Sequence, residues 1–141
     1  MRVLFVCTGN TCRSPMAEAI LKKINEQIEV KSAGIFAADG AGMSVNAQTV
    51  LKEKNIPCSH QSRTLTKEDI EWADYIFTMT TSHKNYIMQM FPKAADKTFS
   101  IKEFVLGRHE DVIDPYGGPV ELYRKTYNEL ESLIRQLAAK L

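Results

Sequence analysis

The chain has 141 residues, of which 44% are hydrophobic and 25% are charged, and its formal net charge is +1. A chain of this length can bury a core without disulfides or metals, so we expect one domain over residues 1–141. The near-neutral charge gives no support for nucleic acid or a membrane as a partner. Any anion site must therefore be local.

The three cysteines, Cys7, Cys12 and Cys58, are too few for a disulfide scaffold, and their number is odd. No secretory signal is visible, and no apolar run approaches the roughly 18 residues of a membrane span. We therefore predict a cytoplasmic protein whose thiols stay reduced and serve chemistry or packing.

Strand-like and helix-like segments alternate along the chain. Short β-branched and aromatic runs predict buried strands at 2–6, 28–33, 74–79 and 97–100. Helix signals lie between them: an N-cap at Ser14 before Pro15, an N-cap at Ser44 for a helix over 44–54, a capping-box pattern from Thr66 to Asp69, and a helix over 81–91. A final helix shows one apolar face, formed by Tyr123, Tyr127, Leu130, Ile134, Leu137 and Leu141.

This alternation predicts a doubly wound α/β fold, with a parallel sheet, right-handed crossovers and helices on both faces. In such folds ligands bind beyond the carboxyl ends of the strands. The stretch VCTGNTCRSP, residues 6–15, stands at that end of the first predicted strand.

The loop from Cys7 to Ser14 has the composition of a phosphate cradle. Backbone amides at a helix start attract an anion, Gly9 permits a positive φ, and Arg13 offers a planar fork of donors. The predicted phosphate-binding residues are Thr8, Gly9, Asn10, Thr11, Cys12, Arg13 and Ser14. The Walker-type lysine and second glycine are missing, which disfavours a nucleotide-binding ATPase.

Cys7 is the candidate nucleophile in this loop. We expect the electropositive loop to lower its thiol pKa below the free value of about 8.5, so that the thiolate can attack phosphorus and form a phosphocysteine. Ser14 can donate its hydroxyl to the thiolate, and Arg13 can hold the transferring oxygens. The alternative is that the cysteines only pack near the strand end, because Cys-x5-Arg alone is a loose pattern.

The leaving group needs a proton donor, and Asp114 in DPYGG, residues 114–118, is the candidate. Pro115 stiffens this turn, the two glycines let it approach other backbone or move, and Tyr116 offers an aromatic wall. Asp-Pro also begins ordinary turns, so this assignment depends on the cysteine loop.

At this point the sequence resembles the low-molecular-weight protein tyrosine phosphatase family over essentially the whole chain. The resemblance is carried by LFVCTGNTCRSPMAEAI, by SAG at 32–34, by ADYIFTMT at 73–80 and by DPYGG. It implies a central four-stranded parallel sheet, phosphorylated protein substrates and no metal or organic cofactor. It also implies roles for five residues: Cys7 as nucleophile, Arg13 as phosphate clamp, Asp114 as general acid and then base, and Asn10 and Ser14 as supports of the loop.

The sequence departs from most of that family at Thr11, where isoleucine or leucine is usual. Threonine there, together with Asp-Pro-aromatic-Gly-Gly, resembles the bacterial protein arginine phosphatase branch. A smaller side chain with a hydroxyl crowds the guanidinium of phosphoarginine less, and Tyr116 can stack on that group. One methyl group discriminates by only ~1–3 kcal/mol, so phosphotyrosine stays the alternative substrate.

Cys12 lies close enough in sequence to Cys7 for a disulfide if the loop curls. We predict that oxidant closes a Cys7–Cys12 bond that spares the nucleophile from over-oxidation, with simple packing of Cys12 as the alternative. Cys58 is predicted to be structural, and the segment SHQSR at 59–63 has no predicted catalytic role. The scattered His60, His83 and His109 do not have the spacing of metal ligands.

Two other classes of protein are weighed against a phosphatase. Thioredoxin-coupled arsenate reductases share the cysteine loop, but they need further cysteines for a disulfide relay, and none follows Cys58. A phosphoprotein-binding module would not need Cys7 and Asp114 together. We expect the enzyme to be a monomer.

Overall fold

The computed structural model describes residues 1–57 and 59–141, so the prediction for Cys58 lies outside the described residues. In chain order its elements are β1 (Arg2–Cys7), α1 (Arg13–Ile24), β2 (Glu29–Gly34), α2 (Val45–Glu53), α3 (Lys67–Trp72), β3 (Tyr75–Thr78), α4 (Thr81–Met90), the 3-10 helix η1 (Pro92–Lys97), β4 (Thr98–Ser100), α5 (Ile101–Leu106) and α6 (Val120–Lys140). Each predicted strand is present, and no strand end differs from its predicted position by more than one residue.

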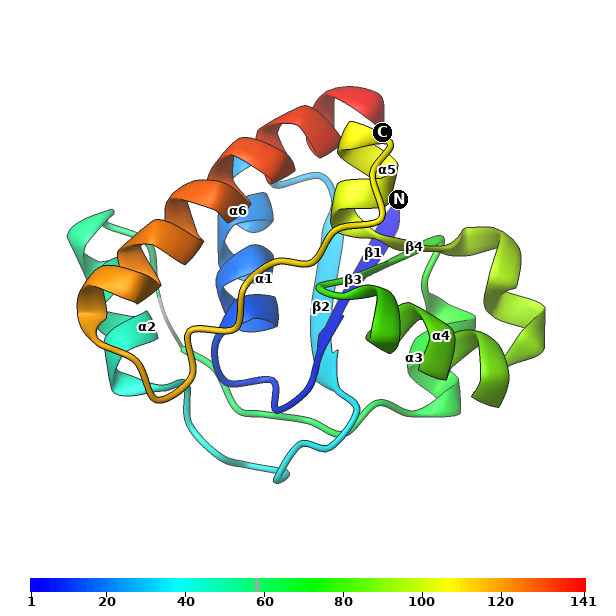
Figure 1. Ribbon diagram of the computed structural model, residues 1–141, viewed down its shortest axis with the longest axis horizontal. Helices are drawn as coiled ribbons and strands as arrows, with labels where there is room; N and C mark the ends of the chain where they lie inside the picture. The colour runs from blue at the N-terminus through cyan, green and yellow to red at the C-terminus, as the bar shows by residue number, and fades with distance from the viewer. Residues whose placement is uncertain (58) are drawn as a thin grey trace.

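The four strands form one parallel sheet in the order β2-β1-β3-β4. Cys7 pairs with Gly34 on one side, and Val6 pairs with Thr78 on the other. The carboxyl ends of the strands therefore meet at one edge of the sheet. Figure 1 shows α1, α2 and α6 on one face of this sheet and α3 and α4 on the other. The predicted α/β architecture is confirmed.

Both faces of the sheet are buried, as expected for parallel strands covered by helices. Along β1, Val3 and Phe5 pack into the cluster formed with α1, α2 and α6. Leu4 and Val6 alternate with them and pack into the smaller cluster on the α3 and α4 face. All four side chains are fully buried, and β1 thus fixes where its last residue, Cys7, emerges.

The helix predictions hold in most places and fail in a few. Every member of the predicted apolar face of α6 is buried except Leu141, which is half-buried at the helix end. Helix α1 begins at Arg13, its N-cap position is Cys12, and no side chain caps it, so the predicted N-cap role of Ser14 is wrong. Helix α5 and the 3-10 helix η1, with six residues each, were not predicted from the sequence. No described helix combines the length and the apolar character that crossing a membrane requires.

Candidate active site

The loop between β1 and α1 forms the floor of a cavity of about 310 Å³ at the carboxyl end of the sheet. Further walls come from the segment after β2 and from the DPYGG segment. The lining residues are Cys7, Thr8, Gly9, Thr11, Cys12, Arg13, Phe36, Ala38, Ala41, Asp114 and Tyr116. The structure thus brings Asp114 to Cys7 and Arg13, which lie much earlier in the sequence.

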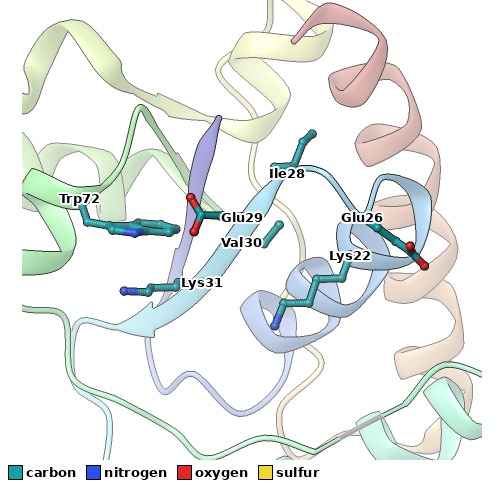
Figure 2. Close-up of a pocket in the computed structure, with 7 residues that line it drawn as sticks. All are labelled: Lys22, Glu26, Ile28, Glu29, Val30, Lys31 and Trp72. Carbon is teal, nitrogen blue, oxygen red and sulfur yellow. The ribbon is translucent and has the colours of Figure 1, made fainter.

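A larger hollow of about 560 Å³ lies along β2, away from this loop (Figure 2). There Glu29 and Lys31 project toward Trp72 of α3, with the Lys31 Nζ 4.4 Å from the ring centroid. Lys22 on the other side pairs with Glu18 of its own helix. Glu29 also pairs with Arg2, and no described cysteine, serine or histidine lines the hollow. The smaller cavity, which is lined by Cys7, is therefore the candidate active site.

Asn10 shapes the cysteine loop from within. Asn10 has a φ of 57°, in the left-handed region. Gly9, for which a positive φ was predicted, does not lie in that region, so the left-handed residue is one position later than predicted. The Asn10 Nδ2 donates to the hydroxyl oxygens of Ser14 at 2.9 Å and Ser32 at 3.0 Å. Asparagine tolerates the left-handed conformation better than most residues, and the buried hydrogen bonds stabilise it there.

The segment at 59–63 also holds Asn10, although the sequence analysis gave it no role. The Ser62 hydroxyl and the His60 Nε2 each donate to the Asn10 carbonyl oxygen at 2.8 Å. The Arg63 backbone N–H donates to the Asn10 side-chain oxygen at 2.9 Å. These contacts support the loop from outside, and they were not predicted from the sequence.

Gly34 at the end of β2 is a second residue whose role the sequence analysis missed. A Cβ there would lie 2.6 Å from the Thr8 carbonyl oxygen and 3.0 Å from the Asn10 nitrogen. Such distances leave no room for any side chain, so glycine is required for the loop to lie against β2.

Cys7 lies at the bottom of the cavity, with its Sγ 2.8 Å from the Ser14 Oγ. Burial raises the pKa of the Cys7 thiol, while hydrogen bonds from Ser14 and the charge of Arg13 act in the lowering direction. The predicted fall in pKa is therefore wrong in sign, because burial outweighs the electropositive loop. The contact of Ser14 with Cys7 agrees with the prediction.

Arg13 is only 4% exposed and directs its guanidinium at the cavity. Its Nη1 donates to the Val112 carbonyl oxygen at 2.9 Å, and its Nη2 lies 3.6 Å from the Asp114 Oδ2. The buried Nε has no partner among the described residues. Since a buried donor without a partner is costly, this fork is arranged for an acceptor inside the cavity.

Asp114 faces Arg13 from a more open segment, and half of its side chain (52%) is exposed. Its Oδ1 accepts a hydrogen bond from the Tyr116 backbone N–H at 3.1 Å. Gly117 has a φ of 78°, and the Asn46 Nδ2 anchors the Gly118 carbonyl oxygen at 3.2 Å. The turn thus carries the carboxylate to the cavity, and Tyr116 stands exposed beside it.

Cys12 has polar neighbours as well as packing partners. Its Sγ lies 3.4 Å from the Tyr123 hydroxyl, 3.5 Å from the Ser44 hydroxyl and 3.7 Å from the Thr11 hydroxyl. Burial and the contact with Cys12 raise the pKa of Tyr123 to about 12. Both Cys7 and Cys12 are free thiols in this structure.

The predicted site residues carry no obvious metal chemistry. Within residues 1–57 and 59–141, no group of three or more His, Cys, Asp or Glu side chains is arranged to hold a metal ion. The Arg13 guanidinium and the hydroxyl-bearing Thr8 and Thr11 line the cavity and can donate hydrogen bonds to an anion.

Comparison with known proteins shows the family of the chain. Residues 2–141 match the family described as low molecular weight phosphotyrosine protein phosphatase. The chain belongs to this family. A Geobacillus stearothermophilus relative named protein-arginine-phosphatase is 56% identical over 143 residues, which cover 99% of this chain and 95% of the relative.

Two further comparisons bear on the phosphatase. A Staphylococcus aureus relative named low molecular weight protein-tyrosine-phosphatase PtpB is 43% identical over 137 residues, which cover 97% of this chain and 96% of that one. A solved structure of a C7S mutant of the YwlE arginine phosphatase, with a phosphorylated active-site serine, superposes with a TM-score of 0.97. It is 47% identical and covers 100% of this chain and 95% of its own. The predicted family, fold and phosphatase class are confirmed.

Proposed function

We propose that this phosphatase removes phosphate from phosphoarginine residues of proteins through a phosphocysteine intermediate. The observation that carries the chemistry is the buried Arg13 fork beside the Cys7–Ser14 pair, inside a loop of backbone amides. A dianionic phosphoryl group would satisfy the Arg13 Nε and place its phosphorus over the Cys7 sulfur.

In the first step the Cys7 thiol gives its proton to a water molecule, and the resulting thiolate attacks phosphorus in line. The S–P bond forms as the P–N bond to the substrate guanidinium breaks. Asp114 gives its proton to the departing nitrogen, which leaves as a neutral arginine guanidine that water then protonates. The loop amides and Arg13 hold the three phosphoryl oxygens, and the Ser14 hydroxyl stabilises the sulfur when its charge returns.

In the second step Asp114 acts as the base. It takes a proton from a water molecule whose oxygen attacks the phosphocysteine, so that the O–P bond forms and the S–P bond breaks. Inorganic phosphate leaves, and Cys7 recovers the bonding electrons. The phosphorylated serine of the YwlE C7S mutant supports a covalent route in that relative.

Thr11 and Tyr116 support phosphoarginine over phosphotyrosine. Both line the cavity that holds Cys7, so the leaving group lies against them. Thr11 gives a short polar wall where a planar polar guanidinium must fit, and the exposed Tyr116 ring offers a stacking face. The relative named protein-arginine-phosphatase is also more similar to this chain than PtpB is, at 56% against 43% identity.

The test is kcat/KM on matched phosphoarginine and phosphotyrosine peptides, for the wild type, Thr11→Ile and Thr11→Val. We expect the wild type to favour phosphoarginine and Thr11→Ile to move the ratio toward phosphotyrosine by about 10–200-fold. Thr11→Val keeps the shape of threonine without its hydroxyl, so it separates crowding from polarity. A wild type that prefers phosphotyrosine would leave the tyrosine alternative in place.

We also propose that oxidant joins Cys7 to Cys12 and that this bond protects the nucleophile in the cytoplasm, where the reduced enzyme works as a one-domain monomer. Both thiols line the cavity, and Cys12 has hydroxyl neighbours in Tyr123 and Ser44. Peroxide should inactivate the enzyme, and a dithiol should restore it. If Cys12→Ala recovers equally well, the protective role is wrong.

A further inference from the structure

His83, near the start of α4, contacts the cysteine loop from the side opposite β2. Its Nε2 and the Thr8 Oγ1 share a hydrogen bond at 2.9 Å. The side chain is buried, with the residue only 7% exposed, while Thr8 stands at the mouth of the cavity directly after Cys7. His83 belongs to no motif, so the sequence alone does not indicate this contact.

Thr8 is therefore fixed from both neighbouring strands. On the β2 side its carbonyl oxygen accepts a hydrogen bond from the Phe36 N–H at 2.9 Å. On the β3 side the helix that follows the strand brings His83 to its hydroxyl. Two fixed points on one residue set the direction of the amides that follow Cys7.

Burying an imidazole at this position costs free energy. Its Nδ1 is buried without a partner among the described residues, and burial and the charge of Arg13 lower the pKa of His83 to about 4. An apolar side chain would fill the space without that cost. A buried polar group with one satisfied atom calls for an explanation, and the bond to Thr8 supplies it.

The start of α4 also reaches the segment that carries Asp114. The Thr81 backbone N–H donates to the Asp111 Oδ1 at 2.8 Å. The Val112 N–H donates to the carbonyl oxygen of Met79, just before the helix. One short stretch of chain thus supports both halves of the site.

We infer that His83 is a positioning residue for the phosphatase reaction, which acts through Thr8 to hold the amides of the phosphate cradle in place. A loosened Thr8 would leave the fold intact and weaken contacts with the phosphoryl oxygens. The loss should be larger for the transition state than for ground-state phosphate, since the cradle matches the transferring group. The kinetic part of this inference rests on the proposed function.

The experiment compares Thr8→Val, His83→Leu and the double variant with the wild type, using a chromogenic aryl phosphate and inhibition by orthovanadate. We expect each single variant to lower kcat/KM and vanadate affinity by the same factor of about 10. The double variant should lose no more than either single one, because both remove the same bond. His83→Gln keeps a polar group near the Nε2 position and should recover most of the loss.

Ile87→Ala is the matched control, because Ile87 is buried one turn further along α4, in the cluster on the α3 and α4 face. It should destabilise the helix packing while kcat/KM and vanadate affinity stay unchanged. Losses that add in the double variant, or a Thr8→Val enzyme with wild-type values, would overturn the inference. Thr8→Val decides the matter even if His83→Leu fails to fold.

Orthophosphate binding, measured by calorimetry, separates this inference from the proposed function. If the wild type turns over no phosphorylated compound, the proposed function fails. Weaker orthophosphate binding in Thr8→Val and His83→Leu, with recovery in His83→Gln, would still support the positioning role. Equal orthophosphate binding in all variants, with equal kinetics, would overturn it.

Discussion

The two loops that meet in the cavity are built in different ways. In the phosphate loop, residues 7–14, four residues are at most 4% exposed: Cys7, Asn10, Arg13 and Ser14. The acid loop, residues 108–119, carries Asp114 with a half-exposed side chain and Tyr116 with 75% exposure.

The contacts of the two loops differ in the same way. Asn10 alone makes five hydrogen bonds, to α1, to β2 and to the segment at 59–63. The acid loop is held to the rest of the fold mainly through one contact at Asp111, two at Val112 and one at Gly118. A site that stabilises charge needs preorganised donors, whereas proton delivery needs a group that lets substrate enter. The difference supports the proposed division, with phosphate binding in one loop and leaving-group chemistry in the other.

Replacing Cys7 removes the step on which both loops depend. We expect Cys7→Ser to lower kcat by more than about 10⁴-fold, because a serine hydroxyl is a far weaker nucleophile than a thiolate. Orthophosphate binding should persist, since the amides and Arg13 remain. Assays of phosphate release measure the loss in kcat, and calorimetry measures orthophosphate binding. Cys12→Ser is the matched control and should retain turnover; comparable turnover in Cys7→Ser would exclude the phosphocysteine route.

Asp114→Asn removes the proton from the acid loop and leaves the phosphate loop intact. We expect kcat to fall by about 10²–10⁴-fold with a poor leaving group, and by less with a good one, because a good leaving group departs without protonation. The measurement is a series of aryl phosphates of graded leaving-group pKa. A loss that is the same across the series would mean that Asp114 is not the acid.

The contrast between the loops also explains what could be predicted from sequence. Cys7, Arg13 and Asp114 could be predicted because they lie in local motifs. Strand β1 could be predicted because its residues form a consecutive apolar run. The contact between Arg13 and Val112 joins positions 99 apart, and only the folded chain shows it. The close approach at Gly34 and the support of Asn10 by the 59–63 segment are likewise tertiary contacts. The predicted direction of the Cys7 pKa shift was wrong because the depth of burial cannot be inferred from neighbouring residues in the sequence.

The buried imidazole of His83 makes the stability of the fold depend on pH. Burial and Arg13 lower its pKa to about 4, and the charges of Asp111 and Asp114 oppose this only in part. In the unfolded chain His83 takes up its proton near pH 6.5. The stability contributed by the neutral His83 is therefore fully present above that pH and is lost as the pH falls toward 4. The loss attributable to His83 is about 3 kcal/mol.

Urea unfolding at pH 7 and pH 4 measures this effect, with His83→Gln as the control that cannot titrate. We expect the wild type to lose about 3 kcal/mol more than the variant between these pH values, because the carboxylates titrate in both proteins and cancel. An NMR titration should show the His83 ring neutral down to about pH 4. The same pH dependence in both proteins would contradict the buried neutral imidazole.

The smallest expected effect tests whether the two loops can be loosened separately. Asn46→Ala removes the hydrogen bond from α2 to the Gly118 carbonyl oxygen, and Ser62→Ala removes one of the bonds to Asn10 in the phosphate loop. Each bond has a net worth of about 1 kcal/mol, so each change should alter the kinetics only by about fivefold.

The direction of each change is what distinguishes the loops. Asn46→Ala should lower kcat for poor leaving groups and leave the inhibition constant of orthophosphate unchanged, because Asp114 loses its position while the cradle does not. Ser62→Ala should weaken orthophosphate inhibition and lower kcat/KM equally for good and poor leaving groups. If both variants weaken orthophosphate binding alike, the acid loop is part of the phosphate cradle, and the division of labour drawn from burial and hydrogen bonding does not hold.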